Sequence, residues 1–388
     1  MSNGNSGVTN HAHLFIDRIE LLWTDPTLAP AKRNLDGMVK KAEALNTVLG
    51  NSALASLITT IKGKTYTTVA AVNTDAAALE AYFPSETVAL TNGDFDTDVN
   101  INASGVNSAS YIDPATAAKP YIYPVTGWTP NFKFKATASQ GNTAVYGATI
   151  TGDKGNNGTN PPATDMFGQT SGGTLHLSSG WSDIARYYQE LPQLLAGDYI
   201  IYYEANNQNN GATTIEGNYF GVGSLTAGSL EGTNNTFVYS DLKTYPYNTW
   251  SASATGFTLN VPQSGARMNV GVIGTTSGSA NGAKLWVDNV TLYYCGWTVP
   301  NIDALLAEQM NETVRATLVA RHTAAVTANS ATPIVPATLA AAQTNLAEAI
   351  AAAEASIAVY EKIHTYLTHL GTANQLGDIP VATFEIGR

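Results

Sequence analysis

The sequence predicts a mainly β fold with helical flanks, in which an antiparallel β-sandwich (a jelly roll) lies between two α-helical spacer segments. Residues 87–296 are rich in Gly, Asn, Thr, Tyr and Val, and their short apolar runs are separated by turn signals. Both flanks show apolar residues at the i, i+3, i+4 spacing of amphipathic helices. A ten-residue phrase also occurs twice, with starts at residues 12 and 283 that are 271 positions apart.

The repeated phrase reads Ala-His-Leu-Phe-Ile-Asp-Arg-Ile-Glu-Leu at 12–21 and Ala-Lys-Leu-Trp-Val-Asp-Asn-Val-Thr-Leu at 283–292. Each copy is followed by Asn, an apolar residue and Asp, at 34–36 and at 301–303. A fixed internal period indicates a repeat architecture. The chain therefore resembles a window of a tandem array, with one complete unit between two partial ones, and this favours a modular scaffold or binding protein.

Residues 1–23 are predicted to be the closing strand of a preceding partial repeat, because residues 12–23 alternate between apolar and polar side chains. An amphipathic strand without its own sheet tends to aggregate unless another segment pairs with it or packs on it. It is expected to pack on the helices, to pair with residues 379–386, or to add to a neighbouring molecule's sheet.

Residues 24–86 are predicted to form the first helical spacer. Two prolines indicate a linker at 24–33, and the helical period then runs to about Phe83. Breaks at Gly50 and Gly63 predict three short helices.

The sandwich is predicted at residues 87–296. Candidate strands lie at 132–138, 174–178, 198–205, 219–222, 236–239, 256–261, 268–273 and 284–294. The Gly- and Asn-rich stretches between them predict long loops, which gather at the sheet ends of a sandwich and often carry binding.

Residues 297–375 are predicted to form the second spacer, a helical hairpin that turns at Pro333 and Pro336. Residues 376–388 become β-like again and resemble the start of the sandwich. They are predicted to be the opening strand of a following partial repeat.

The composition favours uncharged partners. Charged residues make up 13% of the chain, about half the usual share, and the formal net charge is −11. The polar surface must come from Asn, Thr, Ser, Gly and Gln, which suits neutral, hydroxyl-rich ligands and an extracellular or cell-surface setting; compositional drift in a secreted β protein explains it equally well. The sequence has no basic stripe for nucleic acid and no apolar run of about 18 residues that would predict a membrane span. No signal peptide is visible in it.

Four phrases in order carry a family resemblance: Leu90-Thr91-Asn92-Gly93-Asp94-Phe95-Asp96, then Gly127-Trp128, then Tyr187-Tyr188-Gln189-Glu190-Leu191 with Leu195-Ala196-Gly197-Asp198-Tyr199, and finally residues 285–292. Together they resemble galactose-binding-like jelly rolls, the fold of many carbohydrate-binding modules. The helical flanks are similar to the spacers of multimodular Bacteroidota-type surface proteins.

The resemblance implies a structural calcium ion, because in such jelly rolls the acid after the Phe often meets the Asp of the closing strand. Asp96 and Asp288 would supply carboxylates, and backbone oxygens near Asn92 and Asp94 would complete a shell of six to eight oxygens. The alternative is that Asp288 caps a turn and Asp96 is solvated.

Aromatic rings beside polar groups are typical of glycan sites. Trp181, with Asp183 and Arg186 nearby, is the leading ligand candidate, and Tyr245-Pro246-Tyr247 looks like an exposed loop. Trp250 is expected to close the sandwich. The expected ligand-binding residues are Trp128, Trp181, Asp183, Arg186, Tyr187, Tyr245 and Tyr247.

The sequence contains no nucleophile elbow, phosphate loop or His-Glu-x-x-His motif. We therefore expect no enzyme activity but a non-catalytic carbohydrate-binding module of a secreted or cell-surface protein, with a neutral glycan or polysaccharide as its partner. The alternative is a structural repeat of a surface adhesin, stalk or phage-borne fibre, with head-to-tail self-association and no small-molecule ligand.

Overall fold

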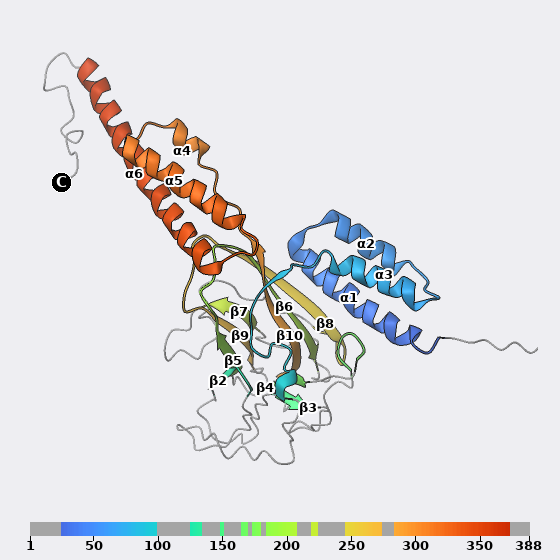
Figure 1. Ribbon diagram of the computed structural model, residues 1–388. Coiled ribbons are helices and arrows are strands. Elements are labelled where there is room, and N and C mark those ends of the chain that lie inside the picture. The colour runs from blue at the N-terminus through green and yellow to red at the C-terminus, as the bar shows by residue number, and fades with distance from the viewer. Residues whose placement is uncertain are drawn as a thin grey trace, which may run out of the picture.

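The computed structural model describes residues 25–98, 125–133, 148–150, 164–169, 173–179, 184–207, 219–223, 245–273 and 283–372. The strands predicted within 1–23, at 236–239 and within 376–388 lie outside these residues. Within them, the predicted fold class is confirmed: along the chain, an antiparallel β-sandwich follows one group of helices and precedes another, and Figure 1 shows both groups packed on the sandwich.

The first group of helices is α1 (Leu28–Leu49), α2 (Ser52–Lys62) and α3 (Val69–Glu80). The linker expected at 24–33 is wrong, since α1 begins at Leu28. Pro30 lies in the first turn of α1, where no helical carbonyl needs its missing N–H. The glycine expected to end this helix does so, because Gly50 adopts a left-handed φ of 59°.

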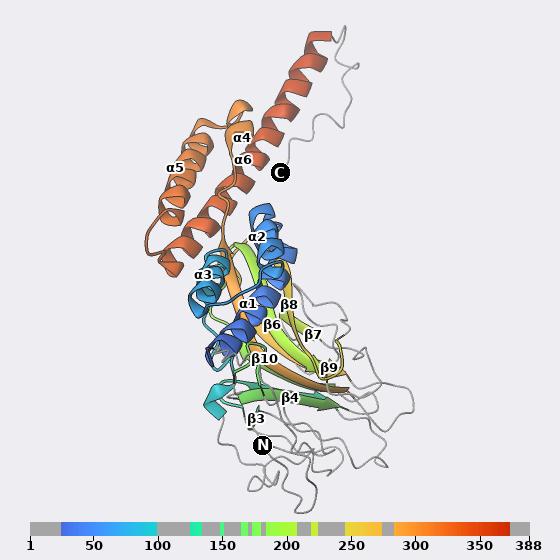
Figure 2. The ribbon, with the colours of Figure 1, turned by 90° about the vertical axis from the view of Figure 1, so that its right-hand side faces the viewer.

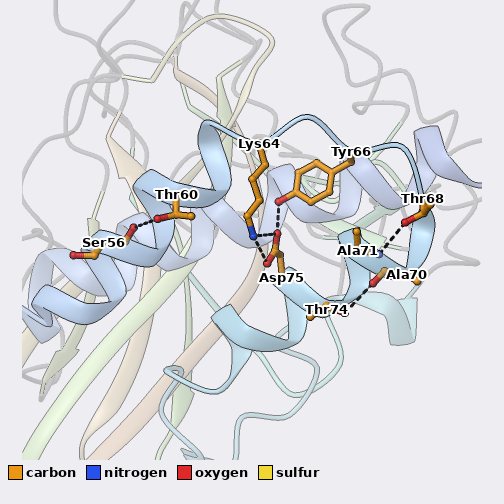
Figure 3. Close-up of polar contacts among 9 residues, drawn as sticks. All are labelled: Ser56, Thr60, Lys64, Tyr66, Thr68, Ala70, Ala71, Thr74 and Asp75. Carbon is orange, nitrogen blue, oxygen red and sulfur yellow. Dashed lines mark hydrogen bonds and ion pairs between the residues drawn. The ribbon is translucent and has the colours of Figure 1, made fainter.

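Asp75 ties the loop after α2 to α3 (Figure 3). Lys64 Nζ lies 2.8 Å from both oxygens of the Asp75 carboxylate, and the Tyr66 hydroxyl donates to one of them. Only 8% of Asp75 is exposed. Although burial alone would raise its pKa, hydrogen bonds from Lys64 and Tyr66 lower it overall.

The sandwich consists of two antiparallel sheets. In the six-stranded sheet, the central strand β10 (Ala283–Gly296) pairs with β1 (Glu86–Val88), β4 (Gly173–Ser179) and β6 (Gly197–Asn207). Strand β3 (Ala148–Ile150) pairs with β4, and β8 (Trp250–Leu259) pairs with β6. The second sheet has the order β2 (Thr129–Lys133), β5 (Ile184–Glu190), β9 (Arg267–Ile273) and β7 (Tyr219–Gly223). A short 3-10 turn, η1 (Asp96–Asp98), precedes β2.

The sandwich core follows from strand alternation, since successive side chains point to opposite faces. Tyr199, Ile201 and Tyr203 of β6 point inward, and Met268 and Val270 of β9 belong to the same buried cluster. The intervening residues of β6 therefore face outward from the sandwich.

Helix α1 covers that outward face of the six-stranded sheet (Figure 2). Ala44 and Leu45 of α1 form a buried cluster with Ile200, Tyr202 and Tyr293. Lys41 Nζ lies 4.9 Å from the centre of the Tyr202 ring, a cation–π contact.

The second group of helices is α4 (Asp303–Ala307), α5 (Glu312–Asn329) and α6 (Pro336–Thr372). Antiparallel α5 and α6 form a hairpin that meets one end of the sandwich, and α6 extends well beyond α5 (Figure 1). The Gln343 amide fastens the hairpin, because it both accepts from the N–H and donates to the carbonyl of Ala196, each over 2.8 Å. None of the described helices is long and apolar enough to cross a membrane.

Candidate ligand-binding surface

Three of the aromatic residues expected to bind ligand are core residues instead. Tyr187, Tyr245 and Trp128 are 0%, 1% and 4% exposed. The Tyr245 hydroxyl is hydrogen-bonded to that of Tyr203 (2.8 Å), and Trp128 Nε1 donates to the Asn92 carbonyl (3.0 Å). A buried ring offers no face to a sugar, so this expectation is corrected for all three.

The other expected ligand residues have different outcomes. Tyr247 is 47% exposed in the turn before β8. Arg186 lies in β5, opposite Asn131 and Gly271. Trp181 and Asp183 lie outside the described residues. Trp250 is buried as expected, but it packs with Met166 and Trp286 in a cluster of its own outside the main sandwich core.

The outer face of the four-stranded sheet is formed by the positions that alternate with core residues along its strands. Because Tyr187, Val222, Met268 and Val270 lie in the core, the alternate positions Tyr188, Gly221, Arg267, Asn269 and Gly271 belong to the outer face. In the described part of the chain, the helix that lies along a sheet face is α1, and it covers the other sheet.

Tyr188, Arg267 and Glu190 form a stacked group on this face. The Arg267 guanidinium carbon lies 4.3 Å from the centre of the Tyr188 ring. Arg267 Nη2 also lies 2.8 Å from Glu190 Oε1, and the two residues are direct cross-strand neighbours. The Arg267 and Glu190 side chains are 27% and 71% exposed, so the group offers an aromatic ring, hydrogen-bond donors and acceptors to solvent without net charge.

Glycines flank this group. Gly223 lies opposite Arg267 on β7, and Gly221 lies opposite Asn269. Both glycines are buried. Asn269 is fully buried, and its amide donates to the Arg267 carbonyl (3.0 Å). Exposure therefore falls from Glu190 toward Asn269.

Of the two adjacent tyrosines, the one expected to bind ligand faces the core. Tyr187 lies inside and Tyr188 outside, because a shift of one position exchanges the two faces of a strand. Polarity along the strand did not distinguish the two faces, because Gln189 is polar and yet lies on the inner face. Its side chain is buried and bonds the backbone of Thr91 and Gly127 instead of facing solvent.

The expected calcium residues surround a loop that is tied to two strands. The Gly93 carbonyl accepts from Val290 N–H on β10 (2.8 Å), and Asp96 Oδ1 accepts from Gly173 N–H on β4 (2.7 Å). Asp94 Oδ1 accepts from Asp96 N–H (3.3 Å), and Asn92 Oδ1 accepts from Thr97 N–H. These contacts hold Asp96 beside β4, a strand of the sheet that contains Asp288.

Asp288 is a buried acid in a negative environment. It is 5% exposed, and its pKa is well above the usual value because of burial first and then the charges of Glu204, Asp96 and Asp165. Its Oδ1 accepts from the N–H of the next residue, Asn289 (2.7 Å). Asp96, in contrast, is exposed.

These oxygen groups are of the type that calcium prefers, but few of them are side-chain carboxylates. Oxygen ligands and a cluster of acids suit a hard cation. Among the described residues, no three acidic, histidine or cysteine side chains gather closely enough to hold a metal ion. A calcium ion here would therefore depend on two carboxylates and on backbone carbonyls.

No protein family and no curated protein matches the chain. Several solved structures are similar to it. One is a family 61 carbohydrate-binding module in complex with β-1,4-galactotriose, with 15% identity over 54% of this chain and 99% of that one at a TM-score of 0.28. Another is the CBM22-1 xylan-binding domain of Paenibacillus barcinonensis Xyn10C, with 10% identity over 46% of this chain and 90% of that one at a TM-score of 0.25.

An enzymatically active domain is similar as well. Tailspike protein 4 of bacteriophage CBA120 shares 13% identity over 53% of this chain and 23% of that one, at a TM-score of 0.26. TM-scores of this size assign no activity to the chain.

Proposed function

We propose that this chain is a non-catalytic module of a secreted or cell-surface modular protein, and that it binds a neutral glycan on the outer face of the four-stranded sheet. The observation that carries the proposal is the stacked group of Tyr188, Arg267 and Glu190 on this face. Helix α1 occupies the equivalent face of the other sheet.

The chemistry of the group favours a neutral glycan. An aromatic ring beside hydrogen-bonding groups suits the C–H face and the hydroxyls of a sugar. The Arg267 guanidinium is paired with Glu190, so it carries no surplus positive charge for a polyanion. The net charge of −11 also opposes binding to anionic polymers.

The proposal can be tested with a glycan array followed by calorimetry on the hits. Tyr188→Ala should weaken binding at least tenfold, while Tyr247→Ala, which removes an exposed tyrosine from another surface, should not. Binding should change little between 50 and 500 mM salt. An array without hits, or equal affinities for wild type and Tyr188→Ala, would contradict the proposal.

The same module is proposed to hold a structural calcium ion through Asp96 and Asp288, with backbone oxygens near Asn92 and Asp94. Support comes from the acids around buried Asp288, which together with burial raise its pKa. The ion would offset this charge and fasten the loop that contains Asp96 to the sheet.

The structural-repeat alternative has its own observation. The C-terminal half of α6 exposes Val359, Ile363, Leu367 and Leu370, which are 40–61% exposed along one apolar stripe. Together with the repeated phrase, this stripe favours head-to-tail association with a second copy of the chain. Sedimentation velocity should then show assemblies that Leu367→Lys disrupts and that Val261→Lys, on the sandwich, leaves intact. A monomer at every concentration would rule this alternative out.

A further inference from the structure

A cavity of about 770 Å³ lies where the α5–α6 turn meets the sandwich, and it belongs to neither the stacked group nor the loop of Asp96. One wall is β1 with the residues that follow it, a second is the segment 192–195, and the third is the turn between the two helices. Figure 1 shows the hairpin approaching this end of the sandwich. The size falls within the range of roughly 300–1,000 Å³ that is typical of small-molecule sites.

The walls are held in place by hydrogen bonds. The Gln343 amide joins α6 to Ala196, next to the segment 192–195. The Tyr294 hydroxyl donates to the same Ala196 carbonyl (3.1 Å), and the Tyr199 hydroxyl donates to the Leu195 carbonyl (2.8 Å). Asn329 Nδ2, at the end of α5, donates to the Trp297 carbonyl (3.0 Å). The cavity is therefore a preformed space between two fastened parts.

The lining carries no formal charge. Among the described residues that form it, none is Asp, Glu, Lys, Arg or His. Its two ionisable side chains are Tyr199 and Tyr294, and burial raises the pKa of Tyr199 above the ordinary value of a tyrosine. A charged ligand would lose its hydration here without meeting a counter-charge.

The lining is apolar at its base and contains both apolar and polar residues elsewhere. Leu194, Leu195 and Tyr199 are at most 8% exposed and form the buried part. Gln193, Thr87 and Thr332 line the same space and are solvent-exposed. Such a lining matches a molecule with an apolar body and one or two hydroxyl or carbonyl groups.

We propose that this cavity is a binding site for an uncharged, amphiphilic small molecule, separate from the glycan surface. The apolar body lies against Leu194, Leu195 and Ile334, and the polar end faces Gln193. The site is formed jointly by the sandwich and the helical hairpin, so its ligand also strengthens the junction between them.

Two fluorescent probes that differ by one charged group test this site. N-phenyl-1-naphthylamine is uncharged, and 8-anilino-1-naphthalenesulfonate has the same aromatic skeleton with a sulfonate. The full chain should bind the uncharged probe with a stoichiometry of one and should bind the sulfonate at least tenfold more weakly. Equal affinity for both probes would overturn the proposal.

Variants locate the probe. Ala331→Trp and Thr87→Trp fill the cavity from two different walls, and each should reduce affinity at least tenfold while circular dichroism confirms an intact fold. Val359→Trp, on the exposed stripe of α6, is the matched control and should leave affinity unchanged. Binding that survives both cavity variants, or that is lost in Leu367→Lys, would place the probe elsewhere and overturn the proposal.

Discussion

Asp288 and Glu204 lie directly opposite each other on strands β10 and β6, and both are almost fully buried, with 5% and 0% exposed. Glu204 accepts from the Tyr202 hydroxyl (2.7 Å) and from Asn289 Nδ2 (3.1 Å). Burial raises the pKa of both carboxyl groups, and each is raised further by other acids nearby. Ionising both in the folded protein is therefore costly.

Stability without metal should depend on pH in a direction set by this pair. A carboxyl whose pKa is higher in the folded state binds its proton more tightly there. Its contribution to the free energy of unfolding therefore falls as pH rises above its unfolded pKa of roughly 4 and is absent above the folded pKa.

Urea unfolding in the presence of a chelator, at pH 5 and at pH 7.5, measures this effect. Asp288→Asn should stabilise the protein relative to wild type at pH 7.5, on the order of 1 kcal/mol, and should do so less at pH 5. Asp198→Asn, at an exposed acid, is the control. An unchanged difference at the two pH values would contradict the assignment.

Bound calcium should offset the cost of ionising Asp288 and Glu204 at neutral pH. Millimolar calcium should raise the melting temperature of wild type, because an ion that binds only the folded state stabilises it. Asp288→Asn and Asp96→Asn should abolish the rise, whereas Asp198→Asn should keep it. A scanning-calorimetry trace that is identical in calcium and in chelator would refute the ion site.

Asp75 should be a stabilising residue of the first helical group. Asp75→Ala leaves Lys64 and Tyr66 without their acceptor, and we expect a loss of about 1–3 kcal/mol in the free energy of unfolding. The pKa of Asp75 is lowered, so its contribution is present above roughly pH 4 and is lost as pH falls further. Lys62→Ala, which breaks the exposed pair with Glu43, is the matched control and should have little effect.

Gln343 should couple the hairpin to the sandwich. Gln343→Ala removes both hydrogen bonds to Ala196, so the Ala196 amide should exchange faster with deuterium and the free energy of unfolding should fall by about 1–3 kcal/mol. Thr344→Ala removes only a bond to the Ala340 carbonyl within α6, so it serves as the control. Unchanged exchange at Ala196 in Gln343→Ala would show that the coupling has another source.

The architecture was predictable because it depends on periodicity and on glycine and proline positions. Gly50 ends α1, and the proline-containing turn joins α5 to α6, as expected. The linker at 24–33 was not predicted correctly, because a proline in a first helical turn has the same sequence signal as a proline in a loop.

The site was less predictable because burial depends on distant partners. Tyr187 and Tyr188 are chemically identical neighbours, and only the opposite sheet decides which of them faces inward. Likewise, Tyr245 looked like a loop residue, but its hydroxyl meets that of Tyr203, 42 positions away in the sequence. The buried pair of Asp288 and Glu204 also arises from strand register, which the sequence alone did not specify.

The pairing of β1 with β10 has a mechanical consequence. Glu86 lies opposite Tyr294, so the chain enters and leaves the sandwich at adjacent points. Tension that pulls α3 away from α4 would load this short antiparallel ladder from its open end and would peel its hydrogen bonds one after another. The remaining strands of the sandwich lie outside this load path, so the chain would lengthen at this ladder while the four-stranded sheet stayed folded.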